Sequence, residues 1–113
     1  MGADDFIKTA KGKTVKEAFE LATQDARYDH GHASYTGTIA EKHSYTLFTL
    51  PEGIKLRDVI DACVDWEAAK LQVLGFTARE AERIVGTYND KWGPACAVEV
   101  EPGTFKFFGI ASS

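Results

Sequence analysis

The sequence has few cysteines and no long hydrophobic run. Cys63 and Cys96 are its only cysteines, and we expect two buried thiols, because two-cysteine frameworks are unusual in unsecreted domains. No apolar stretch approaches the roughly 20 residues of a membrane span, and the first residues lack the basic and apolar regions of a signal peptide. The sequence therefore predicts a cytoplasmic protein with no membrane partner.

Charge of one sign is not concentrated anywhere along the chain. There are 17 acidic and 13 basic residues, for a formal net charge of -4. Affinity for nucleic acid depends on clustered Lys and Arg side chains that release counterions from the phosphates. A nucleic-acid partner is therefore not expected. The length of 113 residues is that of one domain, and we expect a single domain over residues 1–113.

The first part of the chain predicts a strand followed by a helix. Residues 5–10 are short and mixed and precede a turn. Thr14 and Glu17 have the spacing of a capping box. Apolar residues then recur at helical spacing, which predicts a helix that begins at Val15 and ends near residue 30, before Gly31.

The rest of the chain predicts a strand, two helices and a hairpin. Residues 38–50 are rich in β-branched and aromatic side chains and predict the longest strand. Helical stripes follow over 55–75 and 77–92. Two alternating stretches, 95–101 and 104–110, then flank a Pro-Gly turn and predict a hairpin.

The resulting order, β-α-β-α-α-β-β, lacks a regular alternation of strands and helices. It predicts an α+β fold, with a mostly antiparallel four-stranded sheet packed on one face by three helices. Phe107 and Phe108 are adjacent, so a strand would turn one ring away from the helices. We therefore expect a homo-oligomer that pairs through this hairpin.

The segment from Arg27 to His43 holds all three histidines and is dense in hydroxyls and rings. Loops positioned by a scaffold carry function more often than the elements they join. A ring, hydroxyls, a glycine and two cations favour a non-catalytic binding protein for a small nucleotide-like anion. The expected ligand-binding residues are Arg27, Tyr28, His32, Tyr35, Thr36, Gly37, Thr38 and Lys42.

The same segment supports an alternative, a small metal- or His-dependent hydrolase. His30, His32 and His43 are the candidate metal ligands, because imidazole binds zinc and related metals. Asp29 could orient His30 or His32 for acid and base catalysis. No Gly-x-Ser-x-Gly elbow and no glycine-rich phosphate loop occurs, and no cofactor is expected.

Four stretches of the chain also carry a resemblance. Residues 28–32 (YDHGH), 35–42 (YTGTIAEK), 92–95 (WGPA) and 107–111 (FFGIA) resemble a pattern found in small uncharacterised proteins of phages and actinobacteria. The resemblance assigns no role to any residue. It implies a phage-type accessory protein that sequesters a small signalling nucleotide or masks a host protein.

Overall fold

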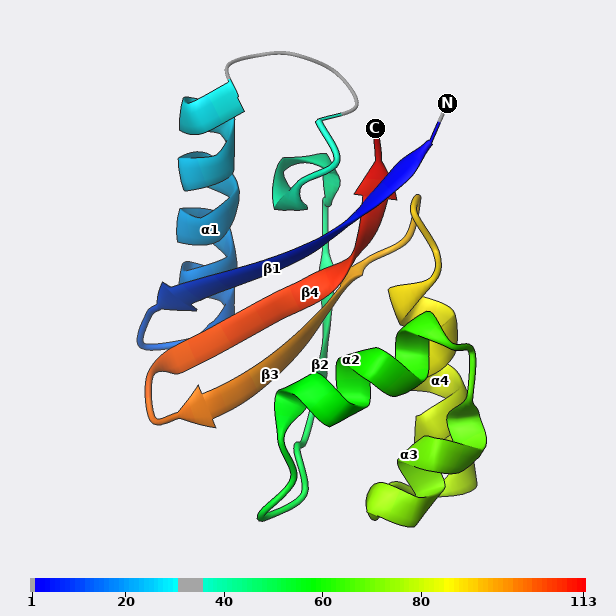
Figure 1. The fold of residues 1–113 in the computed structure, drawn as a ribbon. Helices are drawn as coiled ribbons and strands as arrows, with labels where there is room; N and C mark the ends of the chain where they lie inside the picture. The colour runs from blue at the N-terminus through cyan, green and yellow to red at the C-terminus, as the bar shows by residue number, and fades with distance from the viewer. Residues whose placement is uncertain (1, 31–35) are drawn as a thin grey trace.

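The computed structural model describes residues 2–30 and 36–113, and it confirms the α+β class with a four-stranded sheet (Figure 1). Among these residues no helix is long and apolar enough to cross a membrane. The elements are β1 (Ala3–Lys11), α1 (Val15–His30), the 3-10 helix η1 (Ile39–Glu41), β2 (Tyr45–Phe48), α2 (Leu56–Val64), α3 (Ala68–Leu74), α4 (Ala78–Tyr88), β3 (Ala95–Glu101) and β4 (Thr104–Ser112).

The sheet has the strand order β1-β4-β3-β2, so β1 and β2 are its two edges. β4 pairs antiparallel with both β1 and β3, which confirms the predicted hairpin. β2 pairs parallel with β3, so the sheet is mixed. Gly103 turns the hairpin with a φ of 79°, a conformation that glycine adopts without strain.

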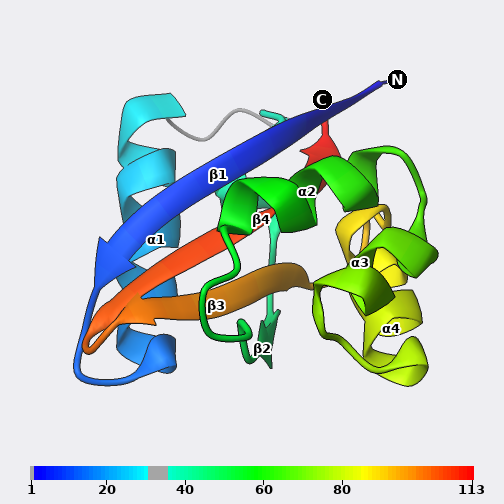
Figure 2. The same ribbon diagram turned by 60° about the horizontal axis from the view of Figure 1, so that its bottom comes forward.

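Helices cover both faces of the sheet (Figures 1 and 2). The prediction of three helices on one face was therefore wrong: α1 and η1 lie on one face, and α2, α3 and α4 lie on the other. Residues 95–98 are buried without a break, which is the pattern of a strand that is covered on both sides. Alternate residues of β3 join different clusters, Ala95 and Ala97 on the α1 face and Cys96 and Val98 on the α2–α4 face.

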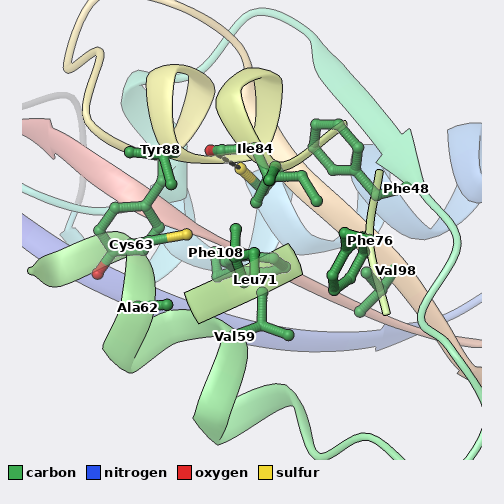
Figure 3. Packing of buried hydrophobic residues seen from close by; sticks show 13 residues of the cluster. Phe48, Val59, Ala62, Cys63, Leu71, Phe76, Ile84, Tyr88, Val98 and Phe108 are labelled. Atoms are coloured by element: carbon green, nitrogen blue, oxygen red, sulfur yellow. Dashed lines mark hydrogen bonds between the residues drawn. The ribbon is translucent and has the colours of Figure 1, made fainter. Parts of the chain in front are cut away.

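The larger cluster lies under α2, α3 and α4. Figure 3 shows Phe108 and Val98 of the sheet pointing into the same space as Leu71 of α3. Phe107 and Phe108 are both fully buried, so the expectation that one ring faces outward to a second copy was wrong. The two rings face opposite helical layers instead, because alternate side chains of a strand point to opposite faces.

The stretch 38–50 is not one long strand. The Thr38 hydroxyl accepts a hydrogen bond from the N–H of Ala40 at 3.2 Å and begins η1. Within this stretch, only Tyr45–Phe48 forms a strand and pairs with β3. Local capping at Thr38 therefore overrides the β propensity of the residues that follow.

The predicted helix over 55–75 is divided at Trp66, which adopts a positive φ of 57°. The Trp66 N–H donates to the carbonyl of Cys63 at 3.1 Å. The side chain of Asn89 donates to the same carbonyl at 2.9 Å. These two hydrogen bonds satisfy a backbone carbonyl at the end of α2 and hold the sharp turn into α3.

The terminal helices follow local signals closely. The Thr14 hydroxyl accepts from the N–H of Glu17 at 3.2 Å, and α1 ends at His30 as predicted. Thr77 and Glu80 form the expected capping box at the start of α4. That helix stops at Tyr88, earlier than the apolar periodicity predicted.

Candidate functional site

The first wall of the candidate site is α1, whose buried stripe is made of small residues. Ala18, Ala22 and Ala26 are buried together with Phe19. Alanines at this spacing let the helix axis approach the sheet closely. In both ribbon views the C-terminal half of α1 extends past the outer side of β1 (Figures 1 and 2). The helix therefore forms a ledge beside β1, which is an edge strand among the described residues.

A hollow of about 230 Å³ lies where this ledge meets the edge of β1, and we call it the β1 notch. Consecutive residues of β1 line it, and because alternate side chains of a strand point to opposite faces, the notch opens onto the edge of the strand. Its lining residues are Asp5, Phe6, Ile7, Lys8, Ala26, Asp29, Gly37, Thr38 and Ile39.

Carboxylates dominate the charge around the notch. The Lys8 ammonium lies 4.0 Å from the carboxylate of Asp25 on α1. No described residue forms an ion pair with Asp29, one helical turn further along, or with Asp4 at the start of β1. The notch therefore offers carboxylates to a cation and repels an anion.

Gly37 closes the notch on the η1 side. Its φ is 71°, and its N–H donates to the carbonyl of Ser112 in β4 at 2.8 Å. A Cβ at this position would lie 2.6 Å from a carboxylate oxygen of Asp4. Both the backbone conformation and the closeness of Asp4 therefore favour glycine here.

The two threonine hydroxyls serve the local structure. The N–H and hydroxyl of Thr36 donate to one carboxylate oxygen of Glu41, at 3.1 and 2.9 Å. The hydroxyls of Thr36 and Thr38 are 2.8 Å apart. This network ties the entry of η1 to its last residue, so the hydroxyls hold the wall of the notch in place.

Lys42 is held inside the protein, with 1% of its surface exposed. Its ammonium donates to the carbonyls of Asp90, Lys91 and Gly93 at 3.1, 3.3 and 3.0 Å. Burial lowers the pKa of Lys42, and the Asp90 carboxylate opposes that effect. Lys42 therefore anchors the turn after α4 and does not line the notch.

Two further predicted ligand-binding residues lie away from the notch. Arg27 and Tyr28 are exposed on α1, and neither lines it. His32 and Tyr35 fall outside the described residues. Of the predicted site residues, the structure brings Asp29, Gly37 and Thr38 together in one hollow.

The candidate metal ligands are not brought together within the described residues. His30 is the last residue of α1. His43 is exposed and lines a separate hollow with Phe19, Ser44 and Tyr45. Over residues 2–30 and 36–113, no group of three or more His, Cys, Asp or Glu side chains could hold a metal ion.

A second hollow lies on the opposite face of the sheet, between α2 and the strands β1 and β4, and we call it the α2 hollow. Ile7 of β1 is 57% exposed beside it. Leu56 and Ile60 of α2 supply further apolar surface, with charged side chains around them. Its lining residues are Ile7, Leu56, Arg57, Ile60, Asp61 and Lys106.

Sequence reasoning missed the residues of β1. The notch residues Asp5, Phe6, Ile7 and Lys8 lie far in the chain from Asp29, Gly37 and Thr38, and only the fold brings the two groups together. The one sequence signal is a charged and apolar strand at the start of the chain. Spacing within that strand does not say which element it faces.

No family model matches the chain, and no curated protein or solved structure is significantly similar to it.

Proposed function

We propose that the protein binds an extended segment of a partner protein, which adds as a further strand to the free edge of β1. The supporting observation is that this edge is flanked by hollows on both faces, the β1 notch and the α2 hollow. In strand addition, main-chain hydrogen bonds provide affinity, and hollows for alternate side chains provide specificity. Both elements of that mode are present at β1.

The lengths of the two edge strands favour β1 as the place of binding. β1 has nine residues and β2 has four. A long edge strand presents a row of backbone donors and acceptors to a second chain, whereas a short edge offers few. The charges on β1, at Asp4, Asp5, Lys8 and Lys11, discourage indiscriminate pairing.

The shape of the site favours a thin occupant. A strand adds about 4.8 Å to the sheet, and the C-terminal half of α1 already extends over the space beside β1 (Figures 1 and 2). An extended segment fits on this ledge. A second copy would bring its own α1 to the same place, because a two-fold axis relating two paired edge strands keeps equivalent helices on the same face.

The charge of the notch favours a peptide over the nucleotide-like anion expected from the sequence. Asp29 lines the notch and Asp4 adjoins it. Phosphate groups need cations or helix N-termini. Lys42, one of the two cations expected to bind phosphate, is held by backbone carbonyls. We therefore propose that the protein is a non-catalytic binding protein and that its ligand is an extended polypeptide.

A random nonapeptide phage library tests the proposal. Peptides selected on the protein should slow amide hydrogen exchange in β1, Ala3–Lys11, by at least about tenfold, because the edge donors become bonded. A selected peptide that is N-methylated at alternate residues should bind at least about tenfold more weakly, since it loses its donors.

A second test is the Ile7→Lys variant, which replaces an exposed side chain that lines both hollows and should fold normally. It should bind the selected peptides weakly. If the peptides protect α2 and α3 instead of β1, or if the library yields no binder, strand addition at β1 is rejected.

A further inference from the structure

Building on strand addition at β1, we infer that the bound segment carries a basic residue next to an aliphatic residue. The basic side chain lies on the α1 side, beside Phe6, and the aliphatic side chain lies on the α2 side, beside Ile7. The inference follows from the different chemistry of the two hollows.

The alternation of a strand separates the two positions. Phe6 packs against the cluster on the α1 face, and Ile7 lines the α2 hollow. In a strand that adds beside β1, the residue opposite Phe6 points to the α1 side, and its neighbour points to the α2 side. Adjacent residues of the partner therefore meet different surroundings, whichever direction its chain runs.

The α1 side selects a positive charge. Asp4 lies next to Gly37 at one end of the notch, and Asp29 lines the notch from α1. Neither carboxylate has an ion pair among the described residues. A Lys or Arg opposite Phe6 would lie between them.

A second basic residue, two places along the partner, is not expected. It would lie opposite Lys8, and like charges directly opposite each other destabilise a pair of strands. The Asp25 carboxylate, which would otherwise attract it, already lies 4.0 Å from the Lys8 ammonium. One basic residue is therefore the pattern that this surface fits.

The α2 side selects an aliphatic side chain. Ile7 is exposed, and Leu56 and Ile60 lie beside it in the α2 hollow. Covering these side chains removes apolar surface from water, which a polar residue on the partner would not do. Arg57 and Lys106 outweigh Asp61 at the same hollow, so a basic side chain of the partner is disfavoured on this side.

The test compares peptides selected from the nonapeptide library on two forms of the protein. On the native chain, Lys or Arg next to Val, Ile or Leu should be enriched about tenfold over the starting library. On the variant that combines Asp4→Lys with Asp29→Lys, Asp or Glu should replace the basic residue. The control, Glu52→Lys with Glu82→Lys, changes exposed carboxylates in the turn before α2 and on α4 and should keep the basic preference.

Amide exchange separates the failure of this inference from that of the proposed function. Peptides that protect β1 but show no basic and aliphatic pair, or the same preference on the native and charge-reversed forms, overturn the inference and leave strand addition standing. Peptides that protect another element overturn strand addition, and the inference with it.

Discussion

The two faces of the sheet are closed by different kinds of side chain. The α2–α4 face is filled mainly by large rings and aliphatic chains, among them Phe48, Leu71, Phe76, Tyr88 and Phe108. The α1 face is closed mainly by alanines, from the helix and from β3, around Phe19 and Phe107. Large side chains bury more apolar surface per residue, so the α2–α4 face should contribute more to stability.

The difference also explains where the candidate site lies. A helix packed through alanines stays close to the sheet and leaves its flank open beside the strand edge, as α1 does at the β1 notch. The α2–α4 face should therefore set the stability of the fold, and the notch should tolerate substitutions that alter binding.

The largest effect is expected from the two adjacent rings of β4. Phe108→Ala should lower the free energy of unfolding by about 4 kcal/mol, and Phe107→Ala by about 3 kcal/mol, because both remove a buried ring and the first opens the larger cluster. Both side chains are fully buried, so exposure does not confound the comparison. Urea denaturation measures both values, and a larger loss for Phe107→Ala would contradict the division.

The second effect is a loss of stability at alkaline pH that originates on the α2–α4 face. Burial raises the pKa of Cys63 to about 12 from its ordinary value of 9.0, and burial raises that of Cys96 in the same direction. Burial, together with the Asp5 carboxylate, raises the pKa of Tyr88 to about 12. The unfolded chain loses these protons first, so the stabilisation is complete below about pH 9 and is lost as pH rises from there.

Each thiol should lower the free energy of unfolding by about 1 kcal/mol per pH unit between pH 9 and 11. Lys42 acts in the opposite direction, because its pKa is lowered and the folded chain loses that proton first. Urea denaturation in the presence of a reductant measures the slope. Cys63→Ala should reduce this slope by the contribution of one thiol. An unchanged slope would show that the Cys63 thiol does not contribute to the loss of stability.

The third effect concerns the buried ammonium of Lys42. Lys42→Met should lower the free energy of unfolding by about 2 kcal/mol, because the carbonyls of Asp90, Lys91 and Gly93 lose their donor. The matched control, Lys55→Met, replaces an exposed lysine and should change stability by less than about 0.5 kcal/mol. If Lys42→Met matched this control in urea denaturation, the ammonium would not be an anchor.

Local signals allowed much of the fold to be predicted. Thr14 and Thr77 cap their helices through contacts three residues away, and a Pro-Gly turn joins two strands that are neighbours in the chain. Such interactions need no knowledge of distant elements. Thr38 acted locally as well, but its hydroxyl begins a 3-10 helix where propensity favoured a strand.

Long-range arrangement decided what the sequence could not show. Which face α1 covers depends on the return of β4 to pair with β1 across the whole chain. Lys42 was expected to bind an anion, because the carbonyls that hold its ammonium lie about 50 residues further along the chain and no local pattern points to them. Asp29, Gly37 and Thr38 were named from the sequence, but β1, the other half of the notch, was not.

The smallest expected effect is the difference in stability between alanine at Gly37 and alanine at Gly53. It separates the cost of the backbone conformation from the cost of the contact with Asp4. Gly37 and Gly53 have similar positive φ values, 71° and 79°. Alanine at either position should cost about 1 kcal/mol of stability for the left-handed backbone. Only at Gly37 does the added Cβ meet a neighbour, a carboxylate oxygen of Asp4 at 2.6 Å, whereas nothing lies within 4 Å at Gly53.

Gly37→Ala should therefore cost about 1 kcal/mol more stability than Gly53→Ala, since the Asp4 carboxylate can rotate away but the Asp4 Cβ, 3.0 Å from the added Cβ, moves only with its strand. Its effect on binding should be clearer. Displacing Asp4 removes a carboxylate from the notch, so basic peptides selected on the native chain should bind Gly37→Ala about threefold more weakly and Gly53→Ala unchanged. Fluorescence anisotropy measures both affinities, and equal losses would mean that Asp4 does not contribute to the choice of partner.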